Sequence, residues 1–501
     1  MLIEAFSSTG CTITTGCSIA RLWKTSSKEL ETWKGSRPDS RLFYFVIMKS
    51  ENMKNENAKA ESNSDWSSSG AESQCLIDPV HEDEVPAVLD EFSERIDEWL
   101  SDRVDEFDPL LWTSTDDRDF RRKAFSELSL YLHVRGISGL PRSAIPLQEL
   151  IDERVNDPRY YTLLFRYPER FLAFAYPFAY AESSGTLRRD AASAVERTLT
   201  DPYIWSVEKV PHRVMDLWCF CLMYGYEIDL NTDDILRMSC LHYPLDPSTA
   251  TPMDVYALTH NLLFYHNFGV KNAAFPGEPT VYDIEELLTG LLLRFILEND
   301  TDIVAELLAV GVLERKLAPT IVRAALGWLR DKMSGRSYIP GPQREDSGID
   351  AEGLSEWEAN YHTNIATAMA IEVLKRDWPA LCQEYGKADP ASQIPNDDLL
   401  RLGDAFRALA SYDLEAAANH LAKLSGSPVV DAYPNLITNA VGYLRSQRTP
   451  DGEFGFLSDE LALYLALGGS SESFQERYVN PITAACNRAL AEFSHETSTP
   501  V

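Results

Sequence analysis

The sequence predicts an all-α protein built from αα-hairpins, and three observations favour this fold class. Apolar residues recur at helical spacings of three and four along most of the chain from residue 80 onward. Alternating strand patterns are nearly absent, so at most a short hairpin of strands is expected. A faint repeat of helix, turn-bearing loop and helix occurs three times, which is the pattern of stacked αα-hairpins.

The predicted helices follow one another along the chain. The first, from Val85 to Leu100, carries apolar side chains three and four residues apart on one face. The same periodicity predicts helices over 119–134, 211–225, 252–268, 280–298, 300–314, 319–333, 357–376, 398–424, 431–446 and 474–493. The aromatic stretch 160–180 contains Pro168 and Pro177 and is expected to form at least two short helices.

The repeat consists of a helix end, a loop and a second helix. The three helix ends carry an aromatic–Leu pair and then a basic residue, in the segments EWLSDR, GWLRDK and GYLRSQ. Each leads through a loop rich in Asp, Gly, Pro or an aromatic residue into another apolar helix. A chain of such hairpins can form an open solenoid or close into a ring, and only closure hides both terminal faces.

Composition excludes nucleic acid as a partner. The chain has 501 residues, of which 45% are hydrophobic, with a formal net charge of −31. The first sixty residues hold nine Lys and Arg against six Asp and Glu, so residues 61–501 hold 71 acids against 37 bases, a net charge of −34. Phosphate neutralisation needs a basic stripe, which this acidic body lacks. A salt-rich (halophilic) cytoplasm and a GC-rich genome are two interpretations of the acidity.

The compartment predicted from the sequence is the cytoplasm. No apolar run is long enough to span a membrane, and the first residues carry Glu4 before any basic residue and lack a secretory apolar stretch. The eight cysteines are scattered and fit no disulfide framework, so we expect most of them to be reduced and buried.

Residues 1–76 are predicted to be a disordered leader ahead of a helical domain at 77–497. The segment 49–74 is almost free of aliphatic side chains and cannot bury enough surface to order itself. An upstream start-codon artefact is one interpretation, with the true start at Met48 or Met53.

The segment 443–456, YLRSQRTPDGEFGF, carries a family resemblance. Pro450 fixes its own φ, Asp451 can bond nearby backbone and Gly452 supplies a positive φ, so a tight turn is expected there. With Gln447 before the turn and Phe454 after it, the segment resembles the QW-type repeat of the terpenoid cyclase and protein prenyltransferase superfamily. Phe454 stands where that repeat usually has tryptophan.

The resemblance implies a fold and a function. The implied fold is an (α/α)6-like toroid over roughly 80–495, and the implied function is an enzyme that acts on a hydrophobic, isoprenoid-like substrate in a central cavity. Two alternatives stay open: a non-catalytic helical-repeat protein that binds a peptide, and a glycan-active (α/α)6 enzyme. The segment 251–269 also resembles an uncharacterised family of bacterial helical proteins, and that resemblance implies no chemistry.

The same superfamily suggests an acid catalyst in the segment DLNTDDIL at 229–236. Its class II cyclases protonate an alkene with an Asp-x-Asp-Asp motif, and this chain has Asn231 at the first position, with Asp233 and Asp234 completing the pair. The resemblance implies Asp233 as proton donor and Asp234 as its partner. The alternative is that these residues cap a helix over 234–239, because acids are favoured at helix starts.

Histidines near aromatic and acidic residues are further candidates. If inner helices line a cavity, a histidine–carboxylate pair there would suit acid–base catalysis, while the aromatic rings would bind substrate. The candidates are catalytic His260, His362 and Glu358, and substrate-binding Tyr256, Phe264, Tyr265 and Tyr361. The alternative is that both histidines are satisfied polar groups packed between helices.

The spacing of the cysteines does not favour a zinc site. Cys240 and His242 lie two residues apart, but Cys219 and Cys221 project in different directions from one helix, and no zinc motif of the superfamily is reproduced. We therefore assign no metal ligands and no cofactor. The expected partner is a hydrophobic small molecule or a peptide, and the oligomeric state is not predicted.

Overall fold

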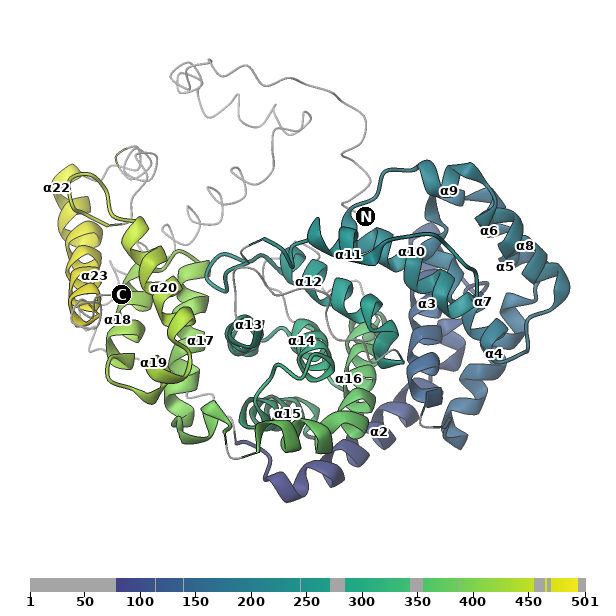
Figure 1. Cartoon of the computed structure of the whole chain (residues 1–501), viewed down its shortest axis with the longest axis horizontal. Helices are drawn as coiled ribbons and strands as arrows, with labels where there is room; N and C mark the ends of the chain where they lie inside the picture. The colour runs from purple at the N-terminus through teal and green to yellow at the C-terminus, as the bar shows by residue number, and fades with distance from the viewer. Residues whose placement is uncertain are drawn as a thin grey trace, which may run out of the picture. The chain divides into compact units, whose positions relative to one another are not determined.

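The computed structural model describes residues 78–493, except 113, 138, 244, 271–283, 343–354, 387, 455–464 and 466–469. Across these ranges the chain is helical and forms no β-strand, which confirms the all-α prediction (Figure 1). An isolated antiparallel bridge joins Arg448 to Phe454. None of the described helices is long and apolar enough to cross a membrane. The predicted leader, with Met48 and Met53, lies outside the described residues.

The first half of the described chain supplies eleven α-helices. They are α2 (Val85–Ser101), α3 (Thr115–Ile137), α4 (Ile145–Val155), α5 (Pro158–Tyr161), α6 (Leu163–Arg166), α7 (Leu172–Ser183), α8 (Arg189–Leu199), α9 (Pro202–Ser206), α10 (Pro211–Tyr224), α11 (Thr232–Arg237) and α12 (Pro252–Tyr265). Pro168 opens a 3₁₀ turn that separates α6 from α7, as expected, whereas Pro177 lies inside α7 and does not divide it.

The second half adds ten α-helices to those described. They are α13 (Ile284–Leu297), α14 (Thr301–Leu313), α15 (Pro319–Met333), α16 (Glu356–Tyr385), α17 (Asn396–Ala410), α18 (Leu414–Leu424), α19 (Pro428–Ala432), α20 (Pro434–Ser446), α22 (Ser471–Phe474) and α23 (Asn480–Glu492). The single helix predicted over 398–424 is wrong. The chain breaks at Tyr412, whose φ of 63° is left-handed, and the side chain of Asp413 then caps α18.

Six helices pack against one another in pairs around the candidate site described below. The pairs in contact are α3 with α7, α7 with α10, α10 with α12, α12 with α14, α14 with α16, and α16 with α3. Elsewhere α13 packs on α14 and α17, while α17 packs on α18 and α18 on α23. The cycle of six helices thus brings α3 and α16, which lie far apart in the sequence, into contact.

A buried ionic network fixes α3 against α2 and α16. The guanidinium of Arg135 on α3 lies 3.1 Å from a carboxylate oxygen of Asp97 on α2 and 3.1 Å from one of Glu372 on α16. The two carboxylates are only 4% and 3% exposed. Tyr131 donates a hydrogen bond to Asp97, and Ser93 donates one to Glu372 at 2.9 Å. Because buried carboxylates need partners, Arg135 holds three helices together.

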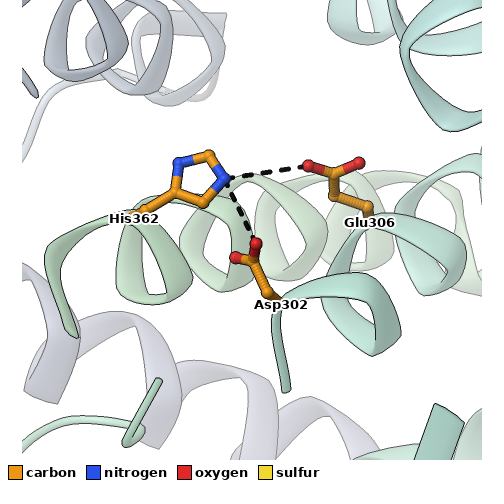
Figure 2. Close-up of side chains that lie close together, drawn as sticks. All are labelled: Asp302, Glu306 and His362. Carbon is orange, nitrogen blue, oxygen red and sulfur yellow. Dashed lines mark ion pairs between the residues drawn. The ribbon is translucent and has the colours of Figure 1, made fainter. Parts of the chain in front are cut away.

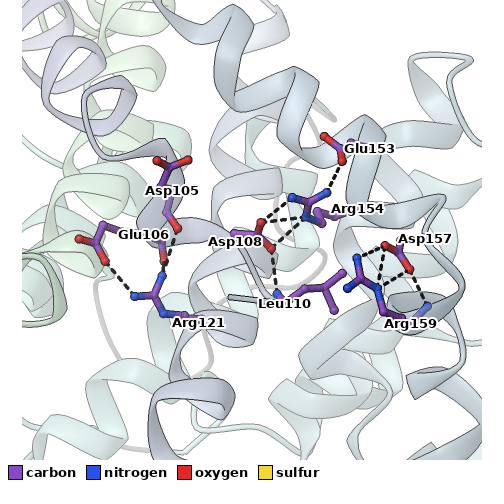
Figure 3. A network of polar contacts seen from close by, with 9 residues as sticks. All are labelled: Asp105, Glu106, Asp108, Leu110, Arg121, Glu153, Arg154, Asp157 and Arg159. Atoms are coloured by element: carbon purple, nitrogen blue, oxygen red, sulfur yellow. Dashed lines mark hydrogen bonds and ion pairs between the residues drawn. The ribbon is translucent and has the colours of Figure 1, made fainter. Parts of the chain in front are cut away.

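A second polar network anchors the loop between α2 and α3 (Figure 3). Asp108, which is 2% exposed, accepts hydrogen bonds from Nε of Arg154 at 2.9 Å and from the backbone N–H of Leu110 at 2.9 Å. Arg121 of α3 donates to the backbone carbonyl oxygens of Asp105 and Glu106. Asp108 therefore holds the guanidinium of Arg154 and the backbone of Leu110 in place, and Arg121 ties the loop to α3.

The turn predicted at 450–452 is present. Gly452 has a φ of 89°, and the backbone N–H of Thr449 donates to the carbonyl oxygen of Glu453 at 2.8 Å. Phe454 follows the turn and is fully buried, so it packs into the core. The turn by itself identifies no superfamily, and closure of the helices into a toroid remains a proposal.

Candidate functional site: a histidine–carboxylate cluster

The centre of the candidate site is a pair of carboxylates on α14. Asp302 and Glu306 lie one helical turn apart, so their side chains share a face. Every residue of α14 is buried, and these two acids are each 4% exposed. In the described part of the chain neither acid forms an ion pair with Lys or Arg. Two carboxylates are thus buried with histidines as their ionic partners.

His362 on α16 faces this pair, as Figure 2 shows. Its Nε2 atom lies 3.4 Å from Oδ2 of Asp302 and 3.9 Å from Oε1 of Glu306. One ligand atom from each of the three residues lies within 4.8 Å of the others. The His362 side chain is 31% exposed, so the histidine covers the carboxylates and faces outward.

His260 on α12 approaches the same carboxylates from another helix. Its Nε2 atom lies 3.4 Å from Oε1 of Glu306, and its side chain is 30% exposed. The rings of Tyr256 and Phe264, one turn before and after, lie 5.9 Å and 5.7 Å from the imidazole. A capping box between Thr251 and Asp254 fixes the start of α12. The helix thereby presents His260 beside Glu306.

Hydrogen bonds from surrounding side chains hold the carboxylates. Tyr256 donates to Oδ2 of Asp302 at 2.7 Å, and Thr363 donates to Oδ1 at 3.4 Å. Thr259 donates to Oε2 of Glu306, the oxygen that does not face the histidines. The orientation of both carboxylates is therefore set by neighbours on α12 and α16.

The second nitrogen of His362 has its own carboxylate partner. Nδ1 lies 3.0 Å from Oε2 of Glu127 on α3, and the other oxygen of Glu127 lies 3.4 Å from Nζ of Lys123. With Nδ1 held by Glu127, Nε2 is directed toward Asp302 and Glu306. The chain of contacts runs from Lys123 through Glu127 and His362 to the carboxylates of α14.

These contacts shift several pKa values. Burial lowers the pKa of His362, but the charges of Asp302 and Glu127 outweigh burial and hold it well above its usual range. Burial raises the pKa of Glu127, and the charges of His362 and Lys123 more than reverse this, to about 2. The pKa of Asp302 is likewise held low, against burial, by the charge of His362 and hydrogen bonds from His362 and Tyr256.

A further polar group lies beside His260 on α10. The ring of His212 is 6.3 Å from that of His260, and burial, followed by the charges of Arg213 and His260, lowers its pKa to about 4. Asp216 is 2% exposed, pairs with Arg213 at 3.0 Å and accepts a hydrogen bond from Tyr176 at 2.5 Å. Polar side chains therefore extend from the cluster onto α10.

Of the residues predicted from the sequence, the structure brings Tyr256, His260 and His362 together. Phe264 flanks His260, and Tyr361 lies beside His362, buried against Trp357 at a ring distance of 5.0 Å. Tyr265 is buried, and its ring lies 5.4 Å from that of His266.

The predicted carboxylates lie elsewhere. Asp233 and Asp234 are in the first turn of α11, where Asn231 caps the helix and Asp234, whose side chain is 61% exposed, pairs with Arg237. Glu358 is the third residue of α16 and forms a capping box with Ser355. The contacts of Asp233 and Asp234 match the helix-start alternative, with Asn231 as the cap.

Sequence reasoning missed Asp302, Glu306 and Glu127. A signal was available in the segment TDIVAELLAVGVL, where two acids four residues apart interrupt an otherwise apolar helix. A solvated helix would carry its acids on a polar face, whereas this helix has two acids but no polar face. Among the described residues no cysteine belongs to the cluster: Cys219 and Cys221 are buried, and Sγ of Cys219 lies 3.5 Å from Oδ1 of Asn267.

Residues 93–371 match the domain of unknown function DUF6895. This span holds the whole cluster, and it holds the segment 251–269, whose expected relation to an uncharacterised helical family is compatible with the match. The segment 443–456 lies outside the span, so the terpenoid cyclase resemblance gains no support. No curated protein and no solved structure matches the chain.

Proposed function

The chain belongs to the DUF6895 family, and we propose that it is a divalent-metal-dependent enzyme whose metal centre is the cluster in this domain. The ligands in this proposal are Asp302, Glu306 and His362, which leave a fourth position open for water, and His260 lies beside Glu306 at the edge of the site. The observation that carries the proposal is the convergence of three ligand atoms within 4.8 Å of one another.

The distances between the prospective ligand atoms support this assignment. Ligands about 2.0–2.1 Å from a tetrahedral zinc ion lie about 3.3 Å from one another. The pairs His362–Asp302 and His260–Glu306 are each separated by 3.4 Å, and His362–Glu306 by 3.9 Å. A cation could therefore be accommodated with small side-chain adjustments. Imidazole and carboxylate ligands suit zinc, manganese and iron.

The outer contacts also support a metal site. A metal-binding histidine ordinarily donates its second ring N–H to a carboxylate or carbonyl, and ligating carboxylates are themselves hydrogen-bonded. Glu127 has this relation to His362, while Tyr256 and Thr259 bond Asp302 and Glu306. A histidine packed for structure alone does not require this layer of partners.

Charge gives a third argument. Burying a carboxylate without a compensating cation is expensive, and Asp302 and Glu306 lie side by side at 4% exposure each. His362, whose pKa is held well above its usual range by the charges of Asp302 and Glu127, supplies one positive charge to these two acids, and their other described partners are hydroxyl groups and His260. A divalent cation would offset the charge of both acids.

The proposed chemistry is attack by a metal-activated water on a polar substrate. A divalent ion held by protein ligands with an open position lowers the pKa of bound water to about 7 and polarises a substrate oxygen. The histidines form the partly exposed side of the cluster, so substrate would approach from that side. We also propose that α3, α7, α10, α12, α14 and α16 close into a ring around the cluster, which their pairwise contacts support.

The isoprenoid hypothesis remains a separate and untested proposal. The side chains around the cluster are polar and include several carboxylates, which favours a polar substrate over a hydrocarbon. If the Asp-x-Asp-Asp resemblance is functional, activity depends on Asp233 and not on Asp302. The two proposals therefore predict opposite outcomes for two matched Asp→Asn variants.

The test is metal binding by the full-length protein. Chelator-treated protein is titrated with Zn²⁺, Mn²⁺ and Co²⁺ by calorimetry, and the Co²⁺ complex is examined by absorption spectroscopy. We expect one equivalent to bind, and His362→Gln or Asp302→Asn to weaken binding by more than about 100-fold, beyond the usual effect of an outer-layer variant. The matched control is Asp234→Asn, at an exposed helix start.

Two outcomes would overturn the proposal. One is that the chelator-treated wild-type protein binds none of the three ions. The other is that His362→Gln and Asp302→Asn, shown to be folded by circular dichroism, bind metal as the wild type does. If the wild-type protein binds an ion, hydrolytic activity on polar ester and phosphoester substrates is assayed with and without that ion.

A further inference from the structure

Arg122 on α3 is a buried guanidinium with few partners. The residue is 7% exposed, and its Nε atom is buried without a hydrogen-bond acceptor among the described residues. Its one ion pair there is with Asp119, at 3.8 Å, which is longer than a hydrogen bond. Burial, followed by the charge of Arg118, lowers the pKa of Arg122. A buried arginine ordinarily has a hydrogen-bond acceptor for each of its N–H groups. The Nε–H of Arg122 has no such acceptor among the described residues.

Two more guanidiniums lie at the same carboxylate. Nε of Arg118 is 3.0 Å from one oxygen of Asp119, and an N–H of Arg170 donates to the other oxygen at 3.1 Å. Arg118 and Arg122 together share Asp119 as their one carboxylate partner in the described part of the chain. Positive charge therefore exceeds negative charge around this pair of arginines.

An aromatic ring forms one wall of the arginine cluster. The guanidinium carbons of Arg122 and Arg170 lie 5.7 Å and 6.0 Å from the ring centre of Phe174, which is 2% exposed. The ring holds the two guanidiniums and shields them from water on that side. A shielded guanidinium binds an oxyanion more strongly than one in water.

We infer that Arg122, together with Arg118 and Arg170, binds the phosphate-type oxyanion of a small ligand. Arg122 supplies an Nε donor that has no acceptor among the described residues, and Arg118 and Arg170 each donate to a different oxygen of Asp119. The planar guanidinium of arginine can donate two parallel hydrogen bonds to two oxygens of a phosphoryl group, which the ammonium of lysine cannot do. This inference rests on α3, α7 and the turn before α7, and it is independent of the proposed metal.

The test is anion binding by the full-length, chelator-treated protein, so that no bound metal contributes. Inorganic phosphate, sulfate, phenyl phosphate and acetate are titrated by calorimetry, with sodium chloride at matched ionic strength as reference. We expect phosphate and phenyl phosphate to bind at one site, with acetate weaker. Arg122→Gln should weaken phosphate binding by about tenfold or more, as for loss of a charge-assisted hydrogen bond.

The control is Arg401→Gln, which removes the same charge from an arginine paired with Asp398 on α17. It should leave phosphate binding unchanged. If Arg122→Gln does not fold, Arg118→Gln replaces it, and phosphate should raise the melting temperature of the wild type but not of that variant. Tighter binding of phenyl phosphate than of phosphate would identify an organic phosphate, and equal binding would identify the free ion.

The inference is overturned if phosphate neither binds nor raises the melting temperature of the wild type. It is equally overturned if Arg122→Gln and Arg118→Gln bind phosphate as tightly as Arg401→Gln does, or if acetate binds more tightly than phosphate.

Discussion

Nδ1 of His362 lies 3.0 Å from a carboxylate oxygen of Glu127, a residue 235 positions earlier in the chain. This contact fixes which ring nitrogen faces the carboxylates of α14. Without it the imidazole could rotate or adopt the other tautomer, and Nε2 would no longer be held near Asp302. The relationship makes Glu127 a positioning residue for the proposed metal centre.

Glu127→Gln should weaken metal binding without abolishing it. Loss of an outer-layer partner of a ligating histidine ordinarily costs about 10–100-fold in metal affinity. Calorimetric titration with Zn²⁺ measures the change. Glu358→Gln serves as the control, because Glu358 caps α16 and does not contact His362 through any described hydrogen bond. An unchanged affinity in Glu127→Gln would contradict the assigned role.

Arg135→Leu should destabilise the fold strongly. The substitution leaves Asp97 and Glu372 buried without their shared cation, and breaking a buried ion pair in this way costs about 3–5 kcal/mol. Urea unfolding followed by circular dichroism measures the free energy of unfolding. Arg159→Leu removes the same charge from a surface pair whose arginine is 71% exposed, and should cost far less stability because water screens an exposed pair. Similar losses in the two variants would argue against the network's role.

Gly327→Ala should be destabilising because of a close backbone contact. A Cβ atom at Gly327 on α15 would lie 2.1 Å from the carbonyl oxygen of Asp78, so the segment before α2 would have to move. Overpacking of this kind costs about 1–3 kcal/mol. Gly442→Ala, in the exposed interior of α20 with no atom within 4 Å, should instead stabilise by about 0.5–1 kcal/mol. Thermal unfolding of both variants tests the opposite signs.

His133 should contribute to acid sensitivity. Burial lowers the pKa of its imidazole to about 4, and its Nε2 atom is buried without a hydrogen-bond partner among the described residues. In the unfolded chain a histidine takes up a proton below about pH 6.5, so the folded state loses stability as the pH falls from about 6.5 toward 4. Between pH 7 and pH 5 the melting temperature of His133→Gln should fall less than that of the wild type. The exposed His81→Gln is the control, and equal pH dependence in all three proteins would refute the assignment.

The sequence carried enough information for the fold class and for part of the site. Helical periodicity placed the starts of α10 and α15 at residues 211 and 319, and in the structure Pro211 and Pro319 occupy these first turns, where proline is tolerated. It could not place the break at Tyr412, because a left-handed residue that is not glycine has no compositional signal.

The site was predicted in part for a similar reason. His260 and His362 were singled out because histidines are few in the chain, whereas Asp302 and Glu306 lie in an apolar run that reads as core. Asp233 and Asp234 matched a motif by spacing alone, and local spacing does not report burial. The sequence of α14 marks Asp302 and Glu306 as unusual acids in an apolar helix. Their contacts with His362 and Tyr256 are seen only when α12, α14 and α16 are brought together in three dimensions.

The contact between α3 and α16 has a consequence for the order of folding. Because its residues are separated by 235 positions, a large loop must close before the contact forms, and nothing can form it until α16 has been synthesised. During translation α3 would emerge long before α16, so Glu127 would lack His362 and Arg135 would lack Glu372. We expect the docking of α16 to be a late folding step, so a nascent chain that ends before Glu356 would lack the α16 side of the buried network and the His362 side of the histidine–carboxylate cluster.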